Sequence, residues 1–220
     1  MSMMTTKTKA YVNQQRVKKR LFYPVCKRGF DLIASLLALV LLSPLFLVIA
    51  LRIKLEDGGP VFYSQTRLGK NEKPFKMYKF RSMVQNADQI KQQLLDQNEV
   101  EGAMFKMKKD PRVTKTGKWI RKYSLDELPQ LVNVLVGDMS LVGPRPPLPS
   151  EVAEYTDYDK QRLLVTPGCT GLWQATVRNK ASFDEMVSLD IEYINKASFW
   201  YDCWIIFMTV KIMICPNSAY

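Results

Sequence analysis

Two adjacent carboxylates, Asp126 and Glu127, are the residues of this chain best suited to acid-base or nucleophilic chemistry. They stand in the stretch "SLDELPQLVNVLVGDMSLVGPRP", ahead of Pro129 and an apolar run that ends in a Gly-Pro-Arg-Pro corner. Ser124 before them and Pro129 after them predict a helical turn beginning near Ser124, where carboxylates interact favourably with the helix dipole. A purely structural helix start is therefore the alternative to chemistry.

Several cations could serve these acids in phosphoryl chemistry. A carboxylate can attack phosphorus to form an acyl phosphate, and it can also hold Mg²⁺. The oxygens of a phosphoryl group in transfer need positive charge around them. Arg145 stands between two prolines and is suited to grip a phosphate through its planar fork. The other cations expected beside the acids are Lys79, Arg81 and Arg112.

The composition excludes several kinds of site. The chain has 220 residues, enough for one sizeable domain, and contains no histidine. Ser-His and Cys-His triads and His-ligated metals are therefore excluded, and acid-base work falls to Asp, Glu, Lys, Tyr or water. The four cysteines lack C-x-x-C spacing, which favours a reducing, cytoplasmic setting. No G-x-x-x-x-G-K-[ST] loop is present, so we expect no nucleoside triphosphatase of that type.

The positive charge is concentrated at the amino terminus. The net charge is +11, and the first thirty residues contain eight Lys or Arg and no acid. We therefore expect residues 1–26 to form a basic, frayed arm that could lie on anionic lipid. A solvated tail is the alternative.

Residues 32–51, "LIASLLALVLLSPLFLVIAL", are apolar over a length that can cross a hydrocarbon core of roughly 30 Å. Pro44 should kink or break this helix, and Ser43 could satisfy a freed carbonyl. Basic residues flank both ends, so the positive-inside rule favours a helix that enters, bends and leaves on the same face. A straight span with a kink is the alternative. The expected division is a re-entrant membrane helix over 27–55 and a cytoplasmic catalytic domain over 56–220.

The remaining pattern predicts an α+β fold that is mainly helical. A β-hairpin is expected because two β-prone runs flank the turn "KNEK". Apolar residues at helical spacing predict amphipathic helices, some of them at the membrane interface, and the last segment is aromatic enough for either the interface or a buried core. The expected elements are strands within 61–69 and 74–83, helices over 85–99, 150–165 and 183–194, a turn over 166–171 and an aromatic helical segment over 198–214.

Several collinear motifs give the chain a family resemblance from about Lys27 to about Ile214. They are "KRGFD" before the apolar segment with its "SP" pair, "GPVFYSQTRLG", "FKMYKFRSM", the acid-bearing stretch quoted above, "TPGCTGLWQ" and "SFWYDCWII". These stretches resemble the bacterial sugar transferases, which are polyprenyl-phosphate hexose-1-phosphate transferases, also called monotopic phosphoglycosyl transferases.

The resemblance implies a transfer of sugar-1-phosphate from a UDP-sugar to undecaprenyl phosphate at the inner face of the bacterial cytoplasmic membrane, with release of UMP. Such a step initiates capsule, exopolysaccharide or O-antigen synthesis. It further implies that Asp126 is the nucleophile of a phosphosugar-aspartyl intermediate, that Glu127 assists it, and that Mg²⁺ sits at Asp126. Lys79, Arg145 and Asp202 fall on other functional positions of the family, and Ser43 and Pro44 fall on its helix break.

One position departs from the family pattern. Members commonly have Gly-Arg after the "TGLWQ" turn, whereas here Val177 precedes Arg178. A glycine would allow a positive φ more easily than a valine, so the loop shape and a sugar or uridine contact by Arg178 are in question.

The stretch over 98–122 resembles relatives acting on glucose or galactose, which favours UDP-glucose or UDP-galactose, and the family allows a homodimer. No nucleic-acid partner is expected on this interpretation. The alternative from another class is a membrane-tethered basic module that binds lipid or nucleic acid.

Overall fold

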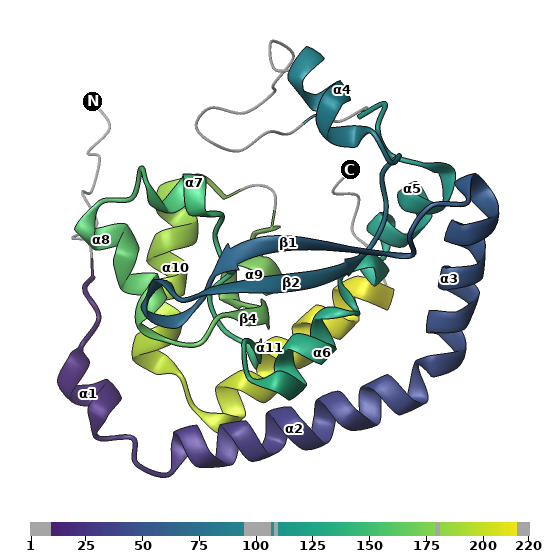
Figure 1. The fold of residues 1–220 in the computed structure, drawn as a ribbon. Helices are drawn as coiled ribbons and strands as arrows, with labels where there is room; N and C mark the ends of the chain where they lie inside the picture. The colour runs from purple at the N-terminus through teal and green to yellow at the C-terminus, as the bar shows by residue number, and fades with distance from the viewer. Residues whose placement is uncertain (1–9, 95–106, 108–109, 179–180, 215–220) are drawn as a thin grey trace, which may run out of the picture.

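The computed structural model describes residues 10–94, 107, 110–178 and 181–214. Figure 1 shows two long helices, α2 along the bottom and α3 along the right, that frame a short β-hairpin, with α10 at the left and α11 between the hairpin and α2 in this view. The described part of the chain is therefore mainly helical with a short antiparallel sheet, and the predicted α+β class is confirmed.

The apolar segment forms two helices, α2 (Tyr23–Leu41) and α3 (Ser43–Asp57), bent by 59° from one another. Pro44 has no N–H to donate to the carbonyl of Val40, and the Ser43 hydroxyl donates to that carbonyl at 2.8 Å instead. The predicted helix break and its compensation by serine are confirmed. Among the described helices, none alone has the length and apolar composition for a membrane span, but this bent pair meets both conditions together.

The outer faces of α2 and α3 expose large apolar side chains. Neither face is covered by another described element, whereas Ile49 and Ile53 on the inner face of α3 are buried. Isolated exposed apolar residues are ordinary, but two connected helices with such faces mark a surface for lipid or protein. The exposed residues are Ile33, Leu36, Leu37, Val40, Leu41, Leu47, Val48, Leu51 and Leu55.

The predicted hairpin is present as β1 (Phe62–Leu68) and β2 (Pro74–Phe80), joined through η1 (Lys70–Glu72). The strands are antiparallel, with Tyr63 opposite Lys79. Side chains alternate across β2, so its two faces meet different neighbours. Phe80 packs with α3 and α5 (Lys115–Lys122), whereas Met77 packs against α6 (Gln130–Val136).

A second small sheet replaces the turn expected over 166–171. β3 (Ser140–Val142) and β4 (Gly168–Thr170) pair in parallel, so the turn prediction is wrong. The reason is steric: a Cβ atom on Gly168 would lie 2.0 Å from the backbone nitrogen of Gly143. This glycine therefore permits two backbones to cross closely and does not serve a reverse turn.

The helices predicted over 150–165 and 85–99 are found in altered form. The first region contains three short pieces, because Thr156 caps a new helix by accepting from the Asp159 N–H at 3.3 Å. In the second region a helix covers residues 87–93, and residues 95–99 lie outside the described residues. The pieces are α4 (Ala87–Gln93), α7 (Pro149–Val152), α8 (Asp157–Lys160) and η4 (Gln161–Leu164).

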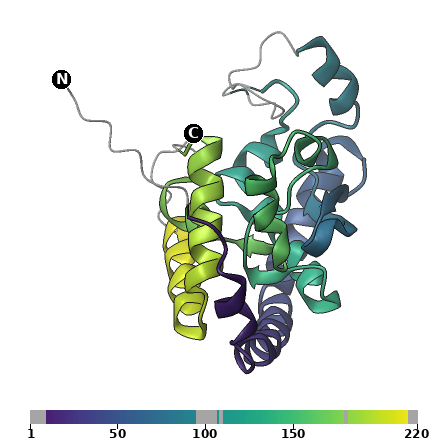
Figure 2. The ribbon, with the colours of Figure 1, turned by 90° about the vertical axis from the view of Figure 1, so that its left-hand side faces the viewer.

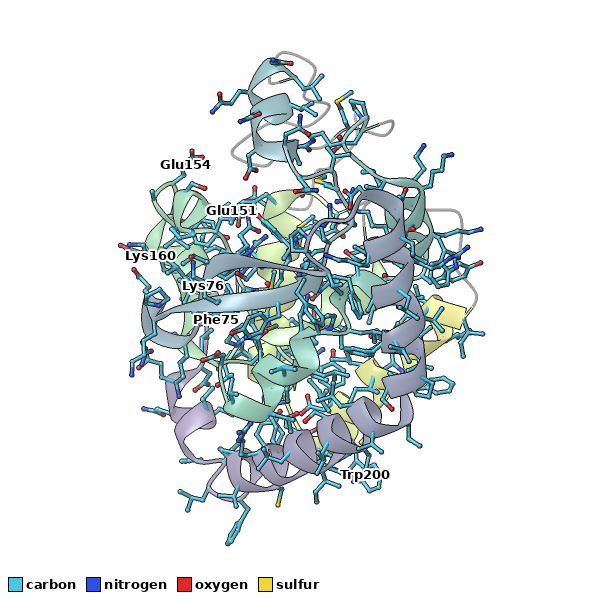
Figure 3. The ribbon with its side chains drawn as sticks, turned by 45° about the vertical axis from the view of Figure 1, so that its right-hand side comes forward. Phe75, Lys76, Glu151, Glu154, Lys160 and Trp200 are labelled. Carbon is cyan, nitrogen blue, oxygen red and sulfur yellow. The ribbon has the colours of Figure 1, made fainter. Side chains whose placement is uncertain are left out.

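The last two helices supply much of the core. α10 (Phe183–Lys196) begins after Ser182, whose side chain accepts from the Glu185 N–H. In α11 (Phe199–Ile214), Ile205 is fully buried, whereas Trp200 is 79% exposed and points outward beside α2 (Figure 3). One face of α11 thus belongs to the core, as one alternative predicted, and the other carries exposed aromatic residues. A membrane interface at that second face remains a prediction.

The described part of the basic arm packs against the protein, contrary to the frayed arm that the sequence suggested. It contains the short helix α1 (Gln14–Lys18), which Figure 2 shows between the lower end of α10 and the start of α2. The Val12 N–H donates to Gln161 Oε1 at 2.8 Å, and Asn195 Nδ2 donates to the Tyr11 carbonyl at 2.9 Å. Contacts with residues distant in sequence, which local composition does not reveal, hold this segment.

Candidate active site

The two acids lie in a single 3₁₀ turn, η3 (Leu125–Glu127), between α5 and α6. Ser124 takes a positive φ of 56°, which turns the chain sharply after α5. Asp126 is 8% exposed, so the fold buries a carboxylate whose position does not suit a solvated helix start. The turn predicted near Ser124 is present, but as a tight corner that directs the acids inward.

Glu127 forms an ion pair with Lys79 from β2. Lys79 Nζ lies 2.5 Å from Glu127 Oε1, and both side chains are mostly shielded from solvent. The hairpin thus places its cation against the acidic turn from 48 residues away in sequence. The two acids consequently differ, because among the described residues Glu127 forms an ion pair with a cation and Asp126 does not.

This asymmetry separates the pKa values of the two acids. Burial and, after it, the negative charge of Glu127 together raise the pKa of Asp126 to about 6, against the opposing effect of Lys79. Burial also acts to raise the pKa of Glu127, but Lys79 and Arg145 outweigh it and hold that pKa below its ordinary value. At neutral pH Asp126 is thus ionised yet close to titrating, which suits a group that carries charge during a reaction.

Arg145 lies beside this pair, on the corner that follows β3. It lines a small cavity of about 10 Å³ together with Lys79 and Glu127. Within the described part of the chain it makes no hydrogen bond or ion pair, which leaves its guanidinium available to an incoming anion. The whole lining comprises Met77, Lys79, Glu127, Gln130, Arg145, Pro146, Gly168, Cys169 and Gln174.

Sequence reasoning missed Arg67, which supports the Arg145 corner. Arg67 is buried and donates to the Pro146 carbonyl at 3.1 Å and to Gln65 at 2.8 Å. Burial, with the nearby charge of Arg145, lowers the pKa of Arg67 to about 10. The alternation of residues in β1 could have indicated that Arg67 shares a face with Gln65, but not which carbonyl it meets.

Three further pocket residues were also missed: Gln130, Cys169 and Gln174. Burial raises the pKa of the Cys169 thiol well above its ordinary value, and the charge of Glu127 adds to this. The thiol is therefore protonated and does not compete with Asp126 as a nucleophile. A signal for Gln174 was available in its place at the end of the "TGLWQ" motif, in α9 (Leu172–Thr176).

The "KRGFD" stretch of α2 holds both walls of this site. Arg28 donates to the carbonyls of Val134 at 2.6 Å and Leu135 at 2.9 Å, at the end of α6. Asp31, buried at 3% exposure, accepts from the Leu141 N–H at 3.1 Å in β3. Through these contacts the apolar helix α2 is attached to the segment after the acidic turn and to the strand before Arg145.

The structure does not bring Arg81 or Arg112 into the pocket. Arg81 pairs with Asp57 at the end of α3 and donates to the Pro60 carbonyl at 2.5 Å. Arg112 pairs with Asp110 at 2.6 Å. The Arg81 guanidinium thus joins the end of α3 to the chain after β2, whereas the Arg112 guanidinium contacts an acid two residues away, before α5. A substrate-binding role remains a prediction for both.

Asp202 lies away from the pocket lining, in a buried network between α2, α10 and α11. Its carboxylate accepts from Tyr23 and Tyr193, each at 2.8 Å, and pairs with Lys27 at 2.8 Å. All these contacts join helices, so Asp202 anchors the start of α2. Direct contact with substrate remains a prediction for this residue.

Arg178 also lies outside the pocket lining. The backbone of its neighbour, Val177, shows whether a valine can replace the usual glycine at this position. Val177 has φ −92°, an ordinary helical value, whereas Arg178 itself takes the positive φ of 52°. Valine therefore fits its position without strain, and the unusual conformation falls one residue later.

The site offers Mg²⁺ a carboxylate oxygen ligand but no complete set of protein ligands among the described residues. Within the described ranges, no group of three or more His, Cys, Asp or Glu side chains could enclose a metal ion. Mg²⁺, however, is commonly held by one or two carboxylates together with substrate phosphates and water. Asp126 supplies such an oxygen ligand, whereas Glu127 is occupied by Lys79.

Comparison with known proteins identifies the family of the chain. Residues 22–216 match the family described as bacterial sugar transferase. The chain is 48% identical to "Galactosyl transferase CpsE" of Streptococcus agalactiae serotype III (strain NEM316), over 89% of this chain and 43% of that protein. It is 43% identical to "Undecaprenyl-phosphate galactose phosphotransferase" of Salmonella typhimurium (strain LT2), over 88% of this chain and 41% of that protein.

A third relative matches over nearly its whole length. It is "Exopolysaccharide production protein ExoY" of Sinorhizobium fredii (strain NBRC 101917 / NGR234), 40% identical over 89% of this chain and 88% of that protein. The chain thus spans less than half of the first two relatives and most of the third. The family match covers most of the chain, and the relatives are 40% to 48% identical to it. The chain therefore belongs to the bacterial sugar transferase family.

Proposed function

We propose that this protein is a phosphoglycosyl transferase that moves a hexose-1-phosphate from a UDP-sugar to undecaprenyl phosphate and releases UMP. The observation that carries this proposal is the buried Asp126, next to a Glu127 already neutralised by Lys79 and close to Arg145. Family membership and the name of the Salmonella relative support the same reaction class.

The proposed reaction has two displacement steps. In the first, the Asp126 carboxylate attacks the sugar-bearing phosphorus, an O–P bond forms, and the bond to UMP breaks with its electron pair leaving on UMP. In the second, a phosphate oxygen of undecaprenyl phosphate attacks the same phosphorus, and the acyl phosphate bond breaks to regenerate the carboxylate. The covalent intermediate separates a soluble donor from a membrane acceptor in time, so both need not be aligned together.

The surrounding residues have distinct roles in this proposal. Arg145 and Lys79 neutralise the phosphoryl oxygens, and Glu127 orients Lys79 while holding the local charge. Asp126 would hold Mg²⁺ through its carboxylate, and the ion would neutralise the diphosphate. Arg67 keeps the Arg145 corner in place through the Pro146 carbonyl.

The proposed location is the cytoplasmic membrane, with the catalytic domain on the cytoplasmic face. The bent α2 and α3 pair would enter and leave the bilayer on that face as a re-entrant element. The supports are the exposed apolar faces of both helices and the proline break between them. The anchoring of α2 to α6 and β3 would then hold the acidic turn at the depth of lipid phosphate groups.

The donor proposed first is UDP-galactose, with UDP-glucose second, because two of the three relatives described above are named for galactose. The product would initiate an extracellular or capsular polysaccharide or O-antigen, in line with the name of the Sinorhizobium relative. A homodimer remains part of this proposal, from the family resemblance alone.

The decisive experiment measures UMP release by the full chain in detergent with Mg²⁺, undecaprenyl phosphate and a panel of UDP-sugars. Asp126→Asn keeps the shape of the side chain and should reduce turnover by at least about 10³-fold, the scale of losing a nucleophile. Without acceptor lipid, the wild-type chain should retain labelled sugar phosphate covalently and the variant should not. Full turnover in Asp126→Asn would refute the aspartyl mechanism, and salt-sensitive binding without turnover would favour a basic binding module.

A further inference from the structure

A second concave site lies at the start of α2, away from the acidic turn. It is a groove of about 600 Å³ between α1, the first turn of α2 and the connection from α10 to α11. It shares no lining residue with the cavity around Arg145, and the reaction proposed above does not use it. Its lining consists of Arg16, Arg20, Phe22, Tyr23, Cys26, Lys196, Ala197, Ser198 and Phe199.

The charge of this groove is positive. Three of the lining residues are cations and none is an acid. Lys196 pairs with Glu192 at 2.8 Å, so the uncompensated charge comes from the two arginines, Arg16 and Arg20. Within the described residues neither arginine pairs with a carboxylate. Two such guanidinium groups at one groove favour an anionic occupant.

Arg20 is fixed in position by the end of α10. Its guanidinium donates to the carbonyls of Ile194 at 2.9 Å and Asn195 at 2.5 Å. These neutral acceptors orient the planar group without cancelling its charge. The groove thus has one preorganised arginine, Arg20, and one exposed arginine on α1, Arg16.

The chain that enters α2 exposes large apolar side chains, and one of them, Phe22, lines the groove. Leu21 is 76% exposed, Phe22 82% and Val25 72%, all at the entry to α2. Aromatic and aliphatic side chains beside a cationic groove match a molecule with a phosphate head and hydrocarbon chains. A free anion such as inorganic phosphate would leave these apolar side chains without a partner.

We propose that this groove binds the headgroup phosphate of an anionic membrane phospholipid, whose chains lie over Leu21, Phe22 and Val25. The inference rests on the membrane location given under the proposed function. It assigns a role to α1, since a bound headgroup would fix the point at which α2 enters the lipid. The occupant is a resident lipid of the bilayer and not the acceptor that reacts at Asp126, because the two sites have separate linings.

The test uses the full chain with Asp126→Asn, so that binding is measured independently of turnover. Delipidated protein in neutral detergent is titrated with phosphatidylglycerol, phosphatidylcholine or inorganic phosphate, and bound lipid is counted by native mass spectrometry. We expect phosphatidylglycerol to bind more tightly than the other two. Adding Arg16→Gln should weaken phosphatidylglycerol binding about fivefold, because one basic residue near an anionic lipid contributes about 1 kcal/mol.

Two further variants keep the test decisive. The Arg16 side chain makes no hydrogen bond within the described residues, so its replacement should leave the fold intact, whereas Arg20→Gln also removes a helix cap. Lys70→Gln, on the exposed hairpin tip, is the matched control for losing one charge and should bind normally.

The inference would be overturned by equal binding of phosphatidylcholine, or by normal phosphatidylglycerol binding in Arg16→Gln with Arg20→Gln combined. Displacement of phosphatidylglycerol from the groove by an equal concentration of undecaprenyl phosphate would also overturn it and identify an acceptor site. Turnover of the chain that retains Asp126, measured in phosphatidylcholine alone, tests the proposed reaction separately. A chain that turns over there yet shows no preference for phosphatidylglycerol keeps the proposed function and loses only this inference.

Discussion

Lys79 and Arg81 lie two residues apart at the end of β2, and each forms an ion pair with an acid, but the two pairs belong to different regions. Lys79 meets Glu127 in the acidic turn beside Arg145, whereas Arg81 meets Asp57 at the end of α3. The first pair lines a cavity and the second joins a helix to a hairpin. The same type of contact therefore lines the proposed active site in one place and joins structural elements in the other, and only its surroundings distinguish the two pairs.

Of these two cations, Lys79 should have the larger effect on turnover when it is replaced. In Lys79→Met the acidic turn loses its cation and the phosphoryl oxygens lose a donor, so kcat should fall by about 10²- to 10³-fold. UMP release under saturating donor measures this. Lys76→Met, an exposed lysine on the same strand, is the matched control and should leave kcat unchanged. A normal kcat in Lys79→Met would show that the ion pair between Lys79 and Glu127 is structural, like that between Arg81 and Asp57.

Replacing Arg81 should affect stability and spare chemistry. Arg81→Met leaves Asp57 without its cation and the Pro60 carbonyl without its donor, so unfolding should become easier by about 2–3 kcal/mol. Denaturant unfolding in detergent measures the change. The comparison fails if kcat per folded molecule falls as far in Arg81→Met as in Lys79→Met, since Arg81 would then act on substrate.

The pH dependence of turnover should follow the ionisation of Asp126. The pKa of Asp126 is raised to about 6, so the ionised nucleophile is lost as pH falls below about 6, and kcat should drop about tenfold for each further pH unit. The raised pKa also means that the folded state binds this proton more tightly than the unfolded state. The contribution of Asp126 to stability is therefore greatest below its unfolded pKa and is lost as pH rises through about 6.

The loss of this stabilising contribution as pH rises predicts how stable the Asp126→Asn protein is. Above pH 6 the variant no longer buries an unpaired charge, so it should be inactive yet at least as stable as the wild-type protein. Thermal unfolding at pH 7 measures this. A flat rate between pH 5 and 8, or a destabilised Asp126→Asn, would show that Asp126 is not the buried, weakly compensated carboxylate described here.

Changes at the loop after α9 should have the smallest effects. Val177 has a negative φ, so Val177→Gly brings no conformational relief and should cost at most about 1 kcal/mol, with turnover within about twofold. Arg178→Gly removes a positive-φ side chain and should be neutral or stabilising in thermal unfolding. A raised KM for the UDP-sugar in Arg178→Gly alone would support its predicted donor contact, and an unchanged KM would remove Arg178 from the site.

Much of the fold was predictable where the signal was local. The Ser43-Pro44 break follows from the chemistry of proline, and the hairpin follows from two β-prone runs around a turn. The turn predicted around Gly168 was wrong. Proline and glycine usually mark turns, whereas here the glycine allows a close backbone crossing with Gly143. The frayed arm was predicted because the composition of this segment resembles a solvated tail. Its described part instead forms hydrogen bonds with Gln161 and Asn195, which the sequence does not place nearby.

The candidate site was predictable only in part, for a similar reason. Asp126, Glu127, Lys79 and Arg145 could be named because they stand in the motifs that resemble the bacterial sugar transferases, and because the absence of histidine leaves few other candidates for the chemistry. Arg67 has no such motif, and its role depends on the carbonyl it meets. Arg81, Arg112 and Asp202 could equally have faced the pocket, since a charged residue pairs with whichever opposite charge folding brings to it.

The sequence by itself determined the family motifs, the adjacent acids, the excess of positive charge and the apolar segment with its proline, because residue type and short spacing carry these properties. Tertiary structure alone decided which cation neutralises Glu127, why Asp126 stays buried without one, and how α2 holds both walls of the site. The physical reason is that pairing and burial depend on distances between segments far apart in the chain. Those distances set the pKa values that distinguish Asp126 from Glu127.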